Sequence, residues 1–381
     1  MKNLWAILAA VGLAAIPVGL YGQVQTRAGL LDIGAHLDVV YRYSAESNNN
    51  PGSDEVYWSG YESLNAETMI LALSGTVNEQ LSWEFNNAFG WPVWTQGVPD
   101  SNFALMVLDA NMKWRIVDPL GLIIGRQLVP TLLCNGPHSM AVLHTANFPL
   151  VLTGGYNAAM VSPPTYQTGI GLELNFADFY INTVYYNGEL VGGNALPGGN
   201  DTGSEQDPDK MKGWNTAIGY SGEVGPGKLK ARGFYFQESS DLNQTEPEDD
   251  SSIAGYGLSA IYDAKIIFVG AEFMSATRDP EDEGAESVTQ YGYYGLVGGR
   301  ISSVELAFRY DFVDYTNQSN ADYPGAEDTN TETWYTFAIN YLINEDATIG
   351  IDYVLKYPEA PEDTDYPNIN EISVIAELDL L

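Results

Sequence analysis

The sequence predicts an all-β protein, a sixteen-stranded antiparallel transmembrane β-barrel. Three observations support this fold class. Sixteen short segments alternate between apolar and polar residues, their connections alternate between short and long, and the N-terminus resembles an export signal. An up-and-down barrel with tight turns at one rim and long loops at the other produces this rhythm.

Residues 1–22 are predicted to be a secretory signal peptide. Lys2 supplies the positive start, and the apolar stretch 4–16 is too short to span a bilayer. An uncleaved anchor helix is the alternative. The rest of the chain has no run of about 20 apolar residues, which a membrane helix needs. Residues 23–381 are therefore expected to form the barrel, which crosses the membrane as strands.

Segment 31–44 shows the alternation that defines the strands. Its odd-numbered residues, Leu31 to Tyr43, are apolar, and its even-numbered residues are polar or small except Val40. Successive side chains of a strand point to opposite faces, so each such segment has one face for lipid and one for water. The sixteen expected strands are 28–45, 65–77, 80–91, 104–116, 120–129, 166–176, 178–188, 212–221, 227–238, 253–263, 265–277, 288–298, 301–312, 331–343, 346–357 and 369–381.

Three of these segments, 178–188, 265–277 and 288–298, are apolar on both faces. We expect them either at a subunit interface or behind an inserted loop. Seven short and eight long connections join the sixteen strands, so both termini lie at the short-turn rim. The long connections are expected near 46–64, 92–103, 130–165, 189–211, 239–252, 278–287, 313–330 and 358–368. An open sheet edge is prohibitive in lipid, so the last strand must pair with the first.

This organisation resembles the sixteen-stranded bacterial outer-membrane diffusion porins. The signal peptide, the strand count and the longest connection, which is the third long one, carry the resemblance. The terminal strand EISVIAELDLL also resembles an outer-membrane assembly signal, although it ends in Leu381 where an aromatic residue is common. The resemblance implies short periplasmic turns, long extracellular loops and a third loop, 130–165, that folds inward and narrows the channel. It also implies a homotrimer in the bacterial outer membrane, in contact with lipid and lipopolysaccharide.

The formal net charge of −34 is concentrated in the long connections. The acidic residues expected at the pore mouth are Asp249, Asp250, Glu281, Asp282 and Glu283. Rings of carboxylates attract cations within roughly a Debye length of about 8 Å, which favours a weakly cation-selective pore. Alternatively, these acidic loops provide solubility or bridge divalent cations to lipopolysaccharide. None of them matches a twelve-residue calcium loop.

The connection 130–165 contains no Asp, Glu, Lys or Arg and is the most apolar of the long connections. This composition suits a loop that packs on the inner wall, although packing against a neighbouring subunit is the alternative. On the loop side, the expected constriction residues are Asn135, His138, His144 and Asn147.

The resemblance implies a basic cluster on the wall opposite this loop. The candidates are Arg42, Lys113, Arg115 and Arg126. A second basic set lies on one face of one strand and either guides small anions or pairs with wall acids. It comprises Lys228, Lys230 and Arg232, with Asp263, Glu272 and Glu305 as the candidate partners.

No cofactor, metal site or enzymatic activity is expected. Cys134, His138 and His144 lack the ligand number and spacing of a zinc or copper site. His36 with Asp38 and Ser44 is the only assembly that resembles a catalytic group, and polar barrel faces collect such residues by chance. The negative charge opposes nucleic-acid binding.

The expected function is passive diffusion of small hydrophilic solutes and ions. Two alternatives stay open: a substrate-specific channel for a sugar or an anion, and a structural or adhesive surface barrel with a blocked lumen.

Overall fold

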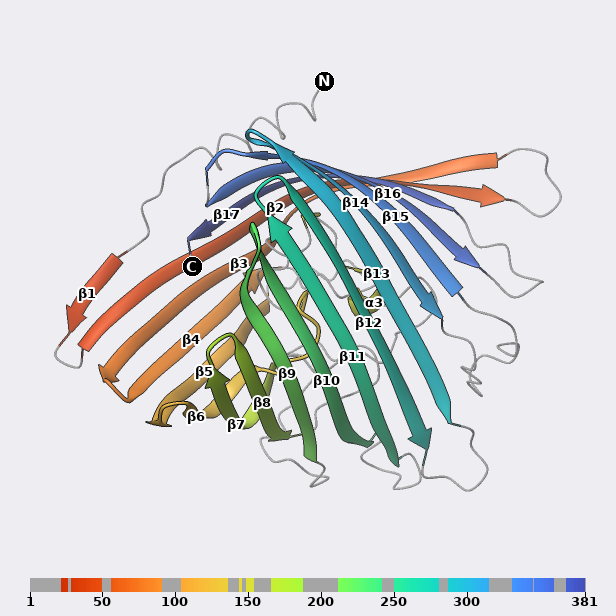
Figure 1. Ribbon diagram of the computed structural model, residues 1–381. Coiled ribbons are helices and arrows are strands. Elements are labelled where there is room, and N and C mark those ends of the chain that lie inside the picture. The colour runs from red at the N-terminus through yellow and green to blue at the C-terminus, as the bar shows by residue number, and fades with distance from the viewer. Residues whose placement is uncertain are drawn as a thin grey trace.

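The computed structural model is a closed antiparallel barrel. It describes residues 22–26, 29–49, 56–90, 104–135, 144–145, 149–153, 166–187, 212–241, 250–280, 287–314, 331–344, 346–359 and 368–380. Each strand from β2 to β17 pairs with the next, and β17 pairs with β2 to close the ring of sixteen (Figure 1). The strands are β1 Gly22–Thr26, β2 Gly29–Asn49, β3 Val56–Asn78, β4 Leu81–Gly90, β5 Ala104–Val117, β6 Leu120–Leu128, β7 Tyr166–Phe176, β8 Phe179–Asn187, β9 Lys212–Val224, β10 Gly227–Asp241, β11 Asp250–Ala264, β12 Ile267–Pro280, β13 Val288–Ile301, β14 Val304–Asp314, β15 Thr331–Leu342, β16 Ala347–Glu359 and β17 Ile369–Leu380.

This topology confirms the predicted sixteen-stranded barrel. The prediction that the first long connection extends over 46–64 is wrong. β2 continues to Asn49 and β3 begins at Val56, so the connection is only 50–55. Polar residues around Ser47 resembled a loop, yet Ser47 pairs with Trp58 and the hairpin continues beyond the ring. Aromatic residues favour strands, which is consistent with this extension. The connection expected over 239–252 is likewise shortened, because β10 and β11 pair as far as Asp241 and Asp250.

A further strand, β1, was not predicted. It is antiparallel to the start of β2: Thr26 pairs with Gly29, and Gly22 pairs with Ile33. The pairing of β17 with β2 ends at Ala35. β1 thus continues the β17 ladder along the same edge of β2. Most of the predicted signal peptide, residues 1–21, lies outside the described residues. Within the part of the chain that the structure describes, no helix has the length and apolar character to cross a membrane.

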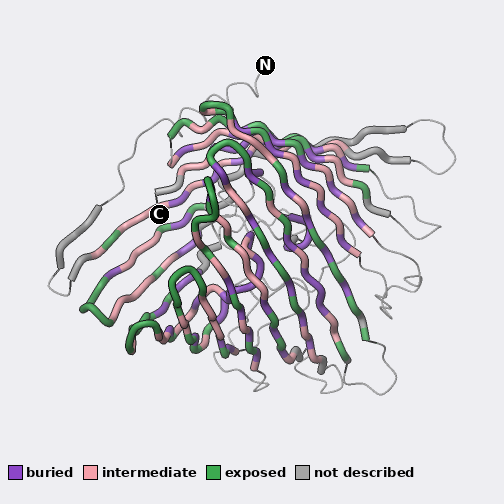
Figure 2. Tube along the Cα trace, in the orientation of Figure 1, coloured by how far each residue is buried: buried purple, intermediate pink, exposed green. Residues whose placement is uncertain are grey.

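The two faces of the barrel wall differ in chemistry. Along β14, the inward residues Glu305, Arg309 and Asp311 are buried, whereas the outward Leu306 is 48% exposed. The same alternation runs through most strands as regular changes of burial along the tube (Figure 2). Apolar side chains on the outside suit lipid, and polar side chains on the inside suit a water-filled lumen. The chain therefore forms a transmembrane β-barrel.

Aromatic side chains form neighbouring pairs on the outer face from β9 to β16. The ring pairs are Trp214–Tyr235, Tyr256–Phe273, Tyr291–Phe312, Tyr293–Tyr310, Tyr310–Tyr335 and Tyr335–Tyr357, with centroids 5.1 to 6.2 Å apart. Aromatic girdles mark the membrane interface of barrels of this kind.

The described parts of segment 130–165 lie inside the barrel. Its short helix α3, Leu150–Thr153, contacts β13 and β14 (Figure 1). Leu132, Cys134 and α3 belong to one buried apolar cluster with inward side chains of β9 to β16. Val129, just before the segment, packs with two residues of β8. Inner apolar residues of β8, β12 and β13, which made these strands ambiguous in the sequence, thus pack against Val129, Leu132, Cys134 and α3.

Candidate pore constriction

Glu272 on β12 holds the start of the inserted segment. Its carboxylate accepts hydrogen bonds from the backbone N–H groups of Leu133 at 2.7 Å and Cys134 at 3.0 Å. Two wall side chains complete the set: the Ser259 hydroxyl donates at 2.5 Å, and the Tyr294 hydroxyl donates from β13. Glu272 is 2% exposed, so it is a buried carboxylate stabilised by four donors.

Arg309 and Asp311 on β14 hold the middle of the segment. The Arg309 Nε lies 2.8 Å from Asp311 Oδ2, and both side chains are fully buried. Arg309 also donates to the Thr145 hydroxyl, and Asp311 accepts from the N–H of Leu150 at 3.1 Å. This ion pair therefore binds two separate points of the segment.

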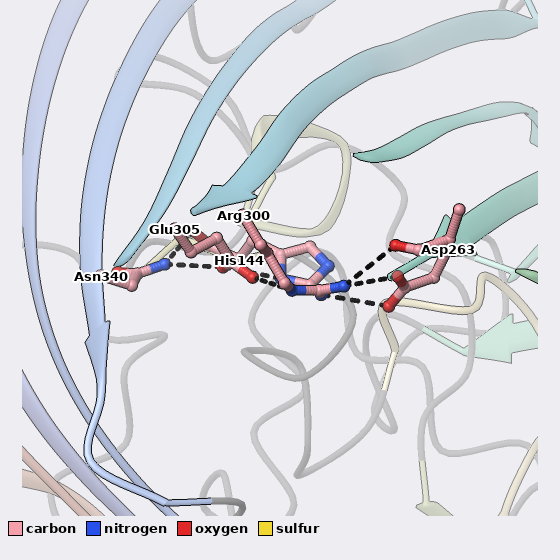
Figure 3. Close-up of polar contacts among 6 residues, drawn as sticks. His144, Asp263, Arg300, Glu305 and Asn340 are labelled. Carbon is pink, nitrogen blue, oxygen red and sulfur yellow. Dashed lines mark hydrogen bonds and ion pairs between the residues drawn. The ribbon is translucent and has the colours of Figure 1, made fainter. Parts of the chain in front are cut away.

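Glu305 is the centre of the third anchor (Figure 3). Its carboxylate lies 2.9 Å from His144 Nδ1, accepts from Arg300 Nε at 2.8 Å and accepts from Asn340 at 3.0 Å. Asn340 also donates to the backbone oxygen of His144 at 2.9 Å, and Arg300 continues to Asp263 at 2.6 Å. The His144 ring stacks on Phe268 with centroids 3.8 Å apart.

Two further features seat the segment. Arg232 donates to the backbone oxygen of Thr131 at 3.0 Å and to the Tyr180 hydroxyl at 2.9 Å. Gly292 on β13 leaves room for α3, since a Cβ there would lie 3.2 Å from Val151 Cγ2 and 2.9 Å from Val313 Cγ2. The segment is thus held by polar contacts from β10 to β15 and by close packing.

Two of the four predicted loop-side residues are described. Asn135 is 8% exposed and donates to the Thr131 hydroxyl at 2.6 Å, within the loop itself. His144 is 6% exposed and contacts Glu305 as given above. His138 and Asn147 lie outside the described residues.

The four predicted wall bases have four different partners among the described residues. Arg42 Nε lies 3.7 Å from Glu371, and Lys113 lies 2.8 Å from Glu84. Arg115 lies 3.8 Å from Asp118 in a short turn and is 65% exposed at its side chain. Arg126 donates to the backbone oxygen of Val107 at 2.7 Å. They are spread over β2, β5 and β6, and their role at a constriction stays a prediction.

The bases that touch the inserted segment are others, and sequence reasoning missed them as a set. Arg309 donates to Thr145 and Arg232 donates to the backbone oxygen of Thr131, whereas Arg300 acts one step away, through Glu305. For Arg232 the sequence left two roles open, guiding small anions or pairing with wall acids, and neither is this contact with the loop. Asp263 and Glu305 are bonded instead by Arg300. The alternation of charged residues on inward faces was the available signal, but it does not reveal which inward residues face the loop.

Of the five predicted pore-mouth acids, only Asp250 is described, as the first residue of β11 paired with Asp241. Its side chain and the residues Asp249, Glu281, Asp282 and Glu283 lie outside the description.

Cys134 offers a chemical measure of how firmly the segment is seated. The thiol is fully buried, and burial followed by the neighbouring Glu272 charge raises its pKa well above the usual range. The reactive thiolate is therefore scarce below that raised pKa, and we expect Cys134 of the folded barrel to resist alkylation at pH 8. Mass spectrometry after iodoacetamide treatment checks this. Alkylation as fast as in the denatured chain would contradict the buried position.

No protein-family model and no curated protein matches the chain. An anion-selective porin from Comamonas acidovorans superimposes with a TM-score of 0.62, 11% identity and coverage of 92% of this chain and 100% of that chain. The outer-membrane channel DcaP of Acinetobacter baumannii superimposes with a TM-score of 0.60 and 13% identity, and the match covers 94% of this chain and 99% of that chain. The chain has the porin fold.

A third solved structure with the porin fold is the outer-membrane protein OmpT of Vibrio cholerae in a trimer form. It has a TM-score of 0.57, 10% identity and coverage of 92% of this chain and 99% of that chain. These likenesses confirm the predicted resemblance for the barrel architecture, which is of the kind found in bacterial outer membranes.

Proposed function

We propose that this protein is a porin of the bacterial outer membrane, through which small hydrophilic solutes and ions diffuse passively. The observation that carries the proposal is the inserted segment, bound to one side of the inner wall by Glu272, Arg309 and Glu305. A segment bound to one side narrows a sixteen-stranded lumen and leaves the opposite wall for solutes. In this proposal the short turns are periplasmic, and residues 1–22 are removed on export.

The wall opposite the segment supports a water-filled path. Inward ion pairs lie there, such as Lys113 with Glu84 at 2.8 Å and Arg42 with Glu371 at 3.7 Å. The Lys113 side chain is 45% exposed, which suits contact with a polar lumen. Mixed charges on this wall moderate selectivity, so the pore is proposed to prefer cations only weakly. A homotrimer is the proposed assembly, supported by the trimer form of the Vibrio cholerae neighbour.

Planar-bilayer conductance of the purified barrel tests the function. Discrete openings, grouped in threes for a trimer, are the expected result. Absence of openings from protein that is folded on a gel would overturn the proposal and favour a structural barrel. Saturable block by one sugar or anion would replace passive diffusion with a substrate-specific channel.

Neutralising the predicted mouth acids tests the source of the selectivity. The variant carries Asp249→Asn, Asp250→Asn, Glu281→Gln, Asp282→Asn and Glu283→Gln. We expect its reversal potential under a salt gradient to shift toward anions, since fewer carboxylates attract cations. The shift should shrink at high salt, because the Debye length falls from about 10 Å at 0.1 M to about 3 Å at 1 M.

The matched control neutralises five acids of the opposite rim, with Glu79→Gln, Asp118→Asn, Asp178→Asn, Glu223→Gln and Asp346→Asn. An equal shift in this control would assign the selectivity to net charge and not to the proposed mouth.

A further inference from the structure

We propose that His36, Asp38 and Glu377 bind a divalent transition-metal ion of the Zn²⁺ class on the inner wall, where the first strand of the ring meets the last. One ligand atom from each of these side chains lies within 4.8 Å of the others. His36 Nε2 and Asp38 Oδ2 are 2.9 Å apart. This group lies on β2 and β17, apart from the strands that hold the inserted segment.

The register of the barrel brings two carboxylates together. Asp38 is the direct cross-strand partner of Glu377 in the β2–β17 ladder. Like charges directly opposite one another destabilise a sheet, and burial makes the repulsion stronger. Arg42 lies 3.7 Å and Lys356 lies 3.0 Å from Glu371, which is six positions before Glu377 on β17.

Asp38 carries an independent sign of a missing ligand. The residue is 8% exposed, and its Oδ1 is buried with no hydrogen-bond partner among the described residues. A buried acceptor without a partner is destabilising, and more so when it is charged. A cation between Asp38 and Glu377 removes both the unsatisfied acceptor and the repulsion.

The donor set selects the class of ion. One imidazole nitrogen and two carboxylate oxygens suit Zn²⁺ and its neighbours, which bind such ligands at about 2.0–2.2 Å. Ca²⁺ takes six to eight oxygen ligands, and Mg²⁺ favours oxygen ligands including several waters, so neither suits this set. A β-bulge interrupts the β2–β3 ladder between Asp38 and Val39, and bulges re-aim side chains beside sites.

Metal binding at this site depends on the protonation of its ligands and links two strands of the barrel. When His36 Nε2 ligates the ion, the ring hydrogen sits on Nδ1; added protons compete with the metal for the imidazole and the carboxylates, so binding weakens as pH falls. The bound ion joins Asp38 and Glu377, which are far apart in the chain, across the seam that closes the ring.

The experiment titrates Zn²⁺ into the full-length barrel in detergent, after chelator treatment, with excess Mg²⁺ to occupy the acidic loops. Calorimetry is expected to give one Zn²⁺ per chain. His36→Gln, Asp38→Asn and Glu377→Gln should each weaken binding by at least about tenfold. Asp32→Asn, an exposed acid on the same strand, is the matched control and should bind like the wild type.

A second measurement separates metal binding from loss of folding. The temperature at which the folded band disappears on a gel should rise with Zn²⁺ in the wild type and in Asp32→Asn, but not in Asp38→Asn. Cys134→Ser and His144→Gln should keep the site.

Three outcomes would overturn the proposal. The first is a folded wild type that binds no Zn²⁺. The second is Zn²⁺ binding that all three ligand variants retain. The third is an Asp38→Asn barrel that, without Zn²⁺, stays folded to the same temperature as the wild type with Zn²⁺. That result would show that the two carboxylates of the wild type share a proton and not a metal ion.

Discussion

Glu272→Gln is expected to release the start of the inserted segment and raise the single-channel conductance. The Glu272 carboxylate accepts from two backbone N–H groups, of Leu133 and Cys134, and from two hydroxyls. A glutamine amide turns one acceptor into a donor, so at least one buried N–H loses its partner. Hydrogen bonds to charged groups contribute about 1.5–3 kcal/mol each, and the Ser259 hydroxyl, 3.4 Å from the N–H of Leu133, is only a weak substitute.

The measurement is conductance in planar bilayers, combined with Cys134 alkylation, which should become faster in the same variant. Glu332→Gln is the matched control, since Glu332 is an equally buried inward acid that accepts from the wall side chain Trp334. Equal conductance changes in both variants would show that the effect comes from barrel loosening. Unchanged conductance and unchanged alkylation in Glu272→Gln would contradict the anchor.

Arg309→Met is expected to destabilise the barrel by about 3–5 kcal/mol, because it leaves the fully buried Asp311 carboxylate without its cation. It also removes the donor to Thr145. Thermal unfolding in detergent, followed by circular dichroism and by the folded band on a gel, measures the loss. Conductance noise should increase, since Thr145 and Leu150 lose part of their support.

The double variant Arg309→Met with Asp311→Leu should recover much of the stability, because replacing both members of a buried pair removes the uncompensated charge. Arg115→Met is the matched control: its partner Asp118 lies 3.8 Å away and both side chains are exposed. Exposed pairs contribute about 0–1 kcal/mol, so this control should change little. Equal losses in Arg309→Met and Arg115→Met would contradict the role of burial.

Strand positions were predictable because lipid and lumen impose a period of two on every strand. β7 begins and ends where the alternation predicted, at Tyr166 and Phe176. The β2–β3 extension and β1 were not predictable from this period. Residues 46–55 are polar and carry no lipid-facing pattern, and the pairing of 46–49 with 56–59 depends on backbone contacts. β1 is only five residues long and overlaps the predicted signal peptide at Gly22.

The site was predictable in part. The lack of charge in 130–165 indicated an inward segment, and its described residues do lie against the inner wall. The anchors were not predictable, since Glu272 and Leu133 are 139 positions apart and only the register of the closed ring brings them together. The wall bases illustrate the same limit: Arg232 contacts the loop, whereas Arg300, which alternation alone did not select, bonds Asp263 and Glu305.

The distant origin of the anchors orders the events of folding. His144 meets Glu305 across 161 positions and Asn340 across 196. Contacts this remote in sequence form only after the intervening chain has lost its freedom, and they slow folding accordingly. β14 and β15 must therefore be in place before His144 can dock. We therefore expect a nascent barrel to pass through a wide-bore stage, and the proposed pore to attain its final permeability limit as the last step of maturation.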